Sequence, residues 1–128
     1  MDLELALFRL RTLVHALPET SEKLSHGAPT WWGGRKTFAC LHDGHYDDGR
    51  PSVWIKLPEG RQAALIDRDP ARFFRPKYLG PAGWVGLRLR ADTDWVEAEA
   101  LLEEGWRSVV TQRAKAALTA RRAAPDPA

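Results

Sequence analysis

The segment from residue 84 to 90 alternates between two kinds of side chain. Val85, Leu87 and Leu89 are apolar, whereas Trp84 and Arg88 occupy alternate positions. Successive side chains of a β-strand point to opposite faces of its sheet. The pattern therefore predicts a strand with one face in a hydrophobic core. Its other face carries an indole beside guanidinium groups.

A second segment, residues 51–57, has the same period of two. Val53, Ile55 and Leu57 would face the core, while Trp54 and Lys56 would point away from it.

Turn-forming residues separate the other extended segments. Gly33 and Gly34 lie between two extended runs and favour a tight hairpin. Residues 43–50 (DGHYDDGR) predict a longer, exposed hairpin tip, and residues 72–78 supply a further strand. Residues 18–29 are expected to form a polar connector.

Three helices are expected. The first has an apolar stripe at steps of three and four residues and ends at Pro18. That stripe consists of Leu3, Leu7, Leu10, Val14 and Leu17. Residues 59–69 predict a short second helix. The third would begin at Asp92 or Asp94 as its N-cap and continue to about Leu118.

These elements follow the order α-β-β-β-α-β-β-α. Consecutive strands joined by short turns pair antiparallel. The predicted fold class is therefore α+β, with a single antiparallel sheet and its helices packed on one face. Residues 1–120 are expected to form one domain, followed by a disordered C-terminal tail at 121–128.

Composition limits the class of protein. The chain has 128 residues and a formal net charge of +2, which is low for a strongly basic nucleic-acid binder. Its single cysteine, Cys40, excludes an intrachain disulfide and is typical of a reducing cytoplasm. No apolar run approaches the roughly 18 residues of a membrane helix. Asp2 and Glu4 are unlike the start of a secretory signal. We expect a soluble cytoplasmic protein.

Several short motifs are similar to those of one protein family. They are Leu17-Pro18, KTFACL at 36–41, PKY at 76–78, WVGL at 84–87 and WRSVV at 106–110. In this order they resemble the MmcQ/YjbR family over roughly the whole chain. The resemblance implies the same order of elements. It also implies a shape related to secretion chaperones and to frataxin-like (CyaY) domains.

Members of that family are described as DNA-binding proteins with a double-wing motif. The resemblance therefore implies DNA as a partner. Basic side chains near the turns and on the outward strand face would contact phosphates. They are Arg35, Lys36, Lys56, Arg72, Arg75, Lys77 and Arg88. The alternative is ordinary turn solubility, since Asp67 and Asp69 lie nearby.

Three tryptophans, Trp32, Trp54 and Trp84, are candidates for the face turned away from the core. Indole rings there could dock a protein partner, as in a chaperone-like module, or line a groove for a small ligand. They could instead shield a bare sheet, with Lys and Arg stems across them. The sequence does not define an oligomeric state, and a monomer is the simpler expectation.

Evidence for metal binding or catalysis is weak. Cys40, His42 and His45 have part of a zinc-ligand spacing, but no second cluster completes it, and a hydrated hairpin tip is simpler. Ser21, Ser25, Ser52 and Ser108 lack a nucleophile-elbow context. We expect no metal, no cofactor and no enzyme activity.

Overall fold

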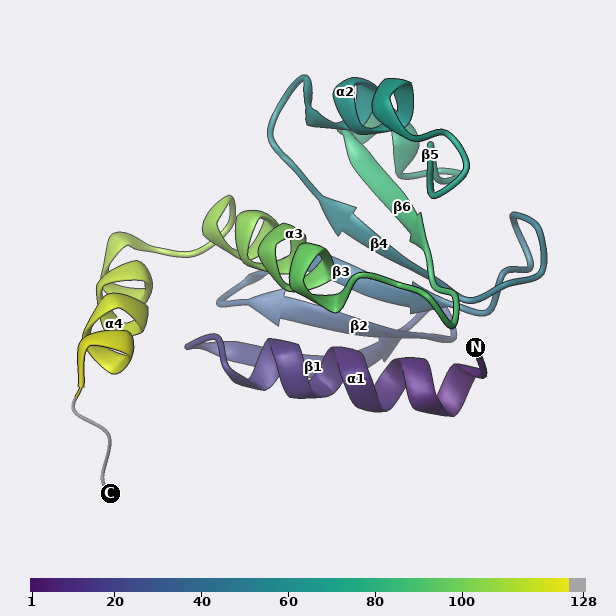
Figure 1. Cartoon of the computed structure of the whole chain (residues 1–128). Helices are drawn as coiled ribbons and strands as arrows, with labels where there is room; N and C mark the ends of the chain where they lie inside the picture. The colour runs from purple at the N-terminus through teal and green to yellow at the C-terminus, as the bar shows by residue number, and fades with distance from the viewer. Residues whose placement is uncertain (125–128) are drawn as a thin grey trace.

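The computed structural model describes residues 1–124 and contains one antiparallel sheet of six strands. The strands are β1 (Thr20–Ser25), β2 (Ala28–Gly33), β3 (Lys36–His42), β4 (Ser52–Lys56), β5 (Phe73–Phe74) and β6 (Trp84–Arg88). Their order across the sheet is β1-β2-β3-β4-β6-β5 (Figure 1). The sheet therefore stays open, with β1 and the short β5 as its edges.

The helices bury side chains in one core on one face of the sheet. They are α1 (Leu3–His15), α2 (Arg61–Arg68), α3 (Trp95–Arg107) and α4 (Gln112–Ala123), with a short 3-10 helix, η1 (Gly80–Ala82). Figure 1 shows α1 and α3 crossing the same face of the sheet. The α+β class, the single antiparallel sheet and the packing of helices on one face are thus confirmed.

Alternation along the central strands builds this core. Val53 and Ile55 on β4 and Val85 and Leu87 on β6 are buried against the helices. At Gly105 of α3, an added Cβ would lie 2.8 Å from both an Ile55 side-chain carbon and the Lys56 carbonyl oxygen. The missing side chain therefore allows α3 to approach β4 closely.

Residues 18–29 form regular structure and not the predicted connector. Thr20–Ser25 is edge strand β1, which pairs along its length with β2. His26 (φ 52°) and Gly27 (φ 79°) make the tight turn between the two strands in the left-handed region. The prediction was wrong because an edge strand with polar side chains lacks the apolar alternation that identifies central strands.

The predicted third helix is two helices. Helix α3 ends at Arg107, and Thr111 caps α4 by accepting a hydrogen bond from the Ala114 amide at 3.2 Å. Apolar residues at 109 and 110 continue the helical spacing across this break, which is why the pattern did not reveal it. Residues 121–123, predicted as part of a tail, belong to α4, and residues 125–128 lie outside the described part of the chain.

The observed order differs from the predicted one by one added strand, β1, one added α-helix, α4, and the short 3-10 helix η1. Neither β1 nor α4 changes the fold class, because β1 extends the sheet at its edge and α4 adds Ala114 and Leu118 to the existing core. Within residues 1–124, no helix is long and apolar enough to cross a membrane.

Candidate functional site

A β-bulge sets which side chains of β3 face away from the helices. Trp31 pairs with Ala39 and Trp32 pairs with Thr37, so Phe38 is an extra residue on β3. Phe38 and Ala39 are both buried in the main core. Thr37 and Cys40 consequently share the opposite face, which we call the open face.

Trp54 and Trp84 form the floor of the open face. Together with Cys40 they make a second apolar cluster, and only 3% and 5% of the two tryptophans is exposed. The Trp54 Nε1 donates a hydrogen bond to the Ser52 Oγ at 3.0 Å. The predicted direction of both indoles is therefore correct, and one role of these rings is to cover the sheet.

Phe74 extends this cover toward the β5 edge. A Cβ at Gly86 would lie 2.3 Å from the Phe74 ring, so the ring lies directly over that glycine. Phe74 meets Trp54 edge-on, with ring centroids 6.5 Å apart. His42 stacks on Trp54, with centroids 3.6 Å apart and planes 14° apart.

Beside these rings the open face is hollowed into a groove of about 430 Å³. Its floor includes Cys40, Trp54 and Trp84, and its rim includes Tyr46 and Tyr78. The two tyrosines come from different loops and meet edge-on at 5.7 Å. The groove is therefore mostly apolar, with hydroxyl and imidazole groups near its mouth.

A second hollow of about 390 Å³ adjoins the groove. The two share Thr37, Leu79 and Trp84. Three basic side chains line the second hollow: Arg35, Lys36 and Lys56. We call this group the cation cluster. The site thus has an apolar part and a basic part side by side.

Arg88 has a structural position on the open face. Its Nε donates to Asp47 at 2.7 Å, and its Nη1 donates to the Pro70 and Ala71 carbonyls at 3.1 and 3.0 Å. Its guanidinium also lies 4.8 Å from the Phe74 ring centroid. These contacts hold the 43–50 loop, and with it Tyr46, beside the sheet. They leave Arg88 little surface for a phosphate.

Arg72 is also engaged within the protein. It donates to Asp69 and to Glu97 of α3, each at 2.6 Å. The hydrogen bond from Arg72 is the main reason why the pKa of Asp69 is lowered. The sequence placed Arg72 on a wing-like turn, whereas the structure uses it to join that turn to α3.

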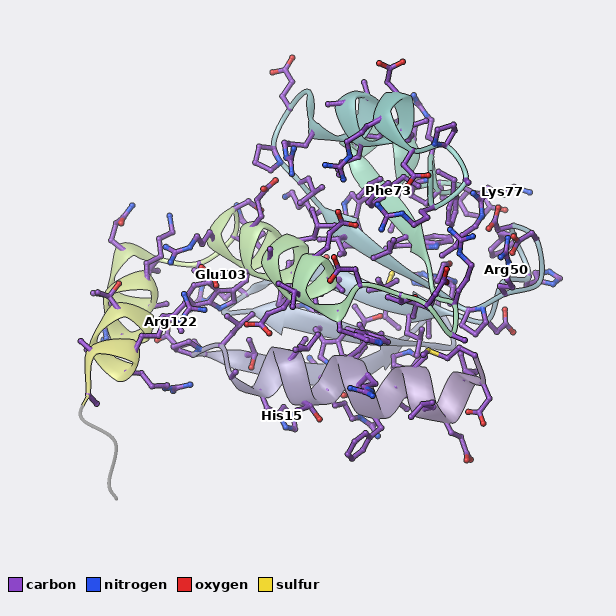
Figure 2. All side chains as sticks on the ribbon, viewed as in Figure 1. His15, Arg50, Phe73, Lys77, Glu103 and Arg122 are labelled. Carbon is purple, nitrogen blue, oxygen red and sulfur yellow. The ribbon has the colours of Figure 1, made fainter. Side chains whose placement is uncertain are left out.

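The other five predicted cations divide into two groups. None of them takes part in an ion pair within residues 1–124. Arg35, Lys36 and Lys56 form the cation cluster. Arg75 packs its stem against Gly80, and Lys77 extends outward in Figure 2, with its Nζ 5.3 Å from the Tyr46 ring centroid. The predicted basic residues therefore do not form one continuous surface.

Titratable groups in the groove are poorly suited to nucleophilic chemistry. Burial raises the pKa of the Cys40 thiol to about 12, so it stays protonated at neutral pH. Burial also lowers the pKa of His42, against a smaller opposing effect from Asp43. In the described part of the chain, no three His, Cys, Asp or Glu side chains gather as a metal site.

The YjbR family model matches residues 15–108 of the chain. The chain belongs to the YjbR family. A crystal structure of the Deinococcus radiodurans protein DR2400, with domain DUF419, has a similar fold, with a TM-score of 0.69. The match covers 88% of this YjbR chain and 87% of that one at 16% sequence identity, so it shows the fold alone. No curated protein matches the chain.

The sequence pattern identified residues on the floor of the groove but not those of its rim. Trp54 and Trp84 followed from strand parity, and Trp32 lies half-buried in the adjoining hollow. Tyr46 and Tyr78 come from loops without periodicity. One signal was present, namely an aromatic residue at 46 inside an otherwise polar tip.

Proposed function

We propose that this YjbR protein is a non-catalytic binding protein whose site is the groove on the open face. The observation that supports this most is the groove itself. Its volume, about 430 Å³, falls within the range of roughly 300–1,000 Å³ that is usual for small-molecule sites. An apolar floor with a few polar groups at the rim is also typical of such sites. The ligand class favoured is a small molecule with an apolar body.

The polar groups that line or adjoin the groove favour binding over catalysis, because the Ser52 and Thr30 hydroxyls are engaged in hydrogen bonds within the protein. The Ser52 hydroxyl accepts from Trp54, and the Thr30 hydroxyl donates to the Ala28 carbonyl at 3.0 Å. The nearest approach to a catalytic pair is Ser25 and His26, whose Oγ and Nδ1 lie 3.2 Å apart. Across residues 1–124, no carboxylate hydrogen-bonds to the ring of His26 to orient it as a base.

The test is a titration with 1-naphthol, followed by ¹H–¹⁵N NMR. Binding in the groove is expected to shift the indole N–H signal of Trp84 and the amides of Thr37 and Cys40. Thr37→Tyr places a bulky ring in the groove at a strand position that tolerates aromatic residues. It should abolish these shifts while the rest of the spectrum stays native-like. Shifts elsewhere, or no shift at millimolar probe, would exclude the groove as the site.

A second candidate function is nucleic-acid binding, as the family resemblance implies. The observation that favours it is the cation cluster on the open face. Lys and Arg side chains without internal partners can displace counterions from phosphates. We propose DNA as the partner in this case and the cytoplasm as the compartment, consistent with the single free thiol.

A further inference from the structure

The cation cluster and the groove adjoin, and we propose that they act as one site for an amphipathic anion. A flat apolar body would lie in the groove, and a phosphate or carboxylate head would lie among Arg35, Lys36 and Lys56. This inference rests on the proposed small-molecule function and specifies the ligand that the groove would take.

The groove and the second hollow are continuous. Thr37, Leu79 and Trp84 line both. Lys56 on β4 is the direct partner of Trp84 on β6, so an ammonium group and an indole lie on neighbouring strands. A ligand seated on Trp84 therefore has a cation beside it.

The second hollow is positively charged. Three cations line it, and none has an ion-pair partner within the described residues 1–124. Like charges gathered beside an apolar surface repel each other, and an anion placed among them relieves that repulsion. The arrangement favours a negative head group and disfavours a cationic one.

Acidic groups near the other end of the groove do not offset this preference. Asp47 accepts hydrogen bonds from Arg88, and Asp48 pairs with Arg50. Lys77 lies outside the cation cluster, at the opposite tyrosine rim, with its Nζ 5.5 Å from the Tyr78 ring centroid. Asp43, next to His42 in the chain, accepts a hydrogen bond from the His45 amide at 2.9 Å, and this one carboxylate does not balance the three charges of the cation cluster.

Four probes separate the two parts of the site: 1-naphthyl phosphate, 1-naphthoate, 1-naphthol and inorganic phosphate. Their dissociation constants would be measured by calorimetry on the full chain. We expect one or both naphthyl anions to bind at least about tenfold more tightly than 1-naphthol, the effect of one good charge-assisted contact. Inorganic phosphate should bind weakly, because it lacks the apolar body.

Variants locate the head group. Lys56→Gln and Arg35→Gln should remove most of the advantage of the anions and leave the affinity for 1-naphthol unchanged. Lys77→Gln is the matched control, because it removes a cation from the opposite rim and should change the anion advantage by less than about twofold. Thr37→Tyr should weaken all three naphthyl probes.

Each contrary outcome has a distinct meaning. Equal affinities for 1-naphthol and both naphthyl anions would overturn the anion inference and leave the groove function standing. Inorganic phosphate binding as tightly as 1-naphthyl phosphate would overturn the joint site, because the apolar body would contribute nothing. Failure of all naphthyl probes to bind would overturn the proposed function itself.

Discussion

Arg88 is the clearest case of a residue whose role depends on its partners. Its side chain is only 16% exposed, and that of Asp47 is 13% exposed. Its one planar guanidinium contacts three parts of the structure: the 43–50 loop, the Phe74 ring, and two backbone carbonyls that precede β5. The planar guanidinium of arginine carries N–H donors that point in several fixed directions, so it can make these contacts at the same time. A lysine ammonium cannot.

Arg88→Met is expected to destabilise the protein by about 2 kcal/mol, because it leaves a partly buried carboxylate without its charged donors. Urea unfolding of both proteins at neutral pH measures this. Arg90→Met is the control. Arg90 Nε lies 4.0 Å from an Asp92 side chain that is 85% exposed, so its loss should change stability by less than about 0.5 kcal/mol. Equal stability of the two variants would contradict a structural role for Arg88.

His42 should make stability depend on pH. Burial lowers its pKa in the folded state below the ordinary value of about 6.5, which the unfolded chain retains. Between the folded-state and unfolded-state pKa values, the unfolded state binds more protons than the folded state. The free energy of unfolding therefore rises with pH in this range, and the His42 contribution is constant above the unfolded-state pKa. As the pH falls below about 6.5, His42 lowers the free energy of unfolding by at most about 1.4 kcal/mol per pH unit.

The measurement is the free energy of unfolding from pH 7.5 to 5.5. His42→Phe keeps an aromatic ring stacked on Trp54 without a titrating group, so the slope in this range should fall. A slope that is unchanged in His42→Phe would show that other groups cause it.

Among the elements, α4 is the one that the sequence pattern did not separate. It is joined to α3 by Glu103, which accepts from Arg122 at 2.5 Å and from Arg107 at 2.9 Å, and Figure 2 shows Glu103 and Arg122 facing each other. Ala114 and Leu118 attach α4 to the core. Arg121 adds a hydrogen bond to the Ala16 carbonyl at 2.9 Å.

Apolar burial should dominate the docking of α4. Leu118 is 2% exposed, so Leu118→Ala is expected to destabilise the protein by about 2–4 kcal/mol. Arg122→Ala should lower the free energy of unfolding by less than about 1 kcal/mol, because the Arg122 side chain is half-exposed in its ion pair with Glu103. Thermal unfolding monitored by circular dichroism compares the two. A larger effect from Arg122→Ala would mean that the ion pair is what holds the helix.

The elements differ in how well the sequence identified them. Strands β4 and β6 and the first helix followed from periodicity, since one face of each is buried. The second helix is short and buries only Leu65. Strand β1 was not predicted because its position at the sheet edge leaves most of its side chains exposed or half-exposed to solvent. The break between α3 and α4 was not predicted because the residues at 109 and 110 are apolar, as a continuing helix would require. They are apolar because they pack beside Gly33, although they lie outside both helices.

For the whole molecule, the distribution of cations limits the strength of DNA binding. Arg72 and Arg88 are engaged internally, and of the other five predicted cations only the three residues of the cation cluster gather at one hollow. About three phosphate contacts correspond to a slope near −3 of log affinity against log salt concentration. Any duplex binding should therefore be weak and moderately sensitive to salt.

A labelled duplex titrated at several salt concentrations tests this. Lys56→Gln should reduce the slope by about one, whereas Arg72→Gln should leave it unchanged. A slope steeper than about −5, or loss of binding in Arg72→Gln alone, would place the DNA surface elsewhere. Absence of binding at low salt would eliminate the nucleic-acid candidate and leave the small-molecule groove.

Sequence patterns alone predicted the α+β class, the core face of the central strands and the outward direction of Trp54 and Trp84. These depend on a period of two or of 3.6 residues, which is local information. Which cations have partners, and where the groove lies, depend on how the chain folds in three dimensions. Tyr46 meets Tyr78, and Arg88 meets Asp47, across gaps of 32 and 41 residues in the chain, and no local pattern encodes such contacts. The bulge at Phe38 likewise becomes visible only when β2 and β3 are paired.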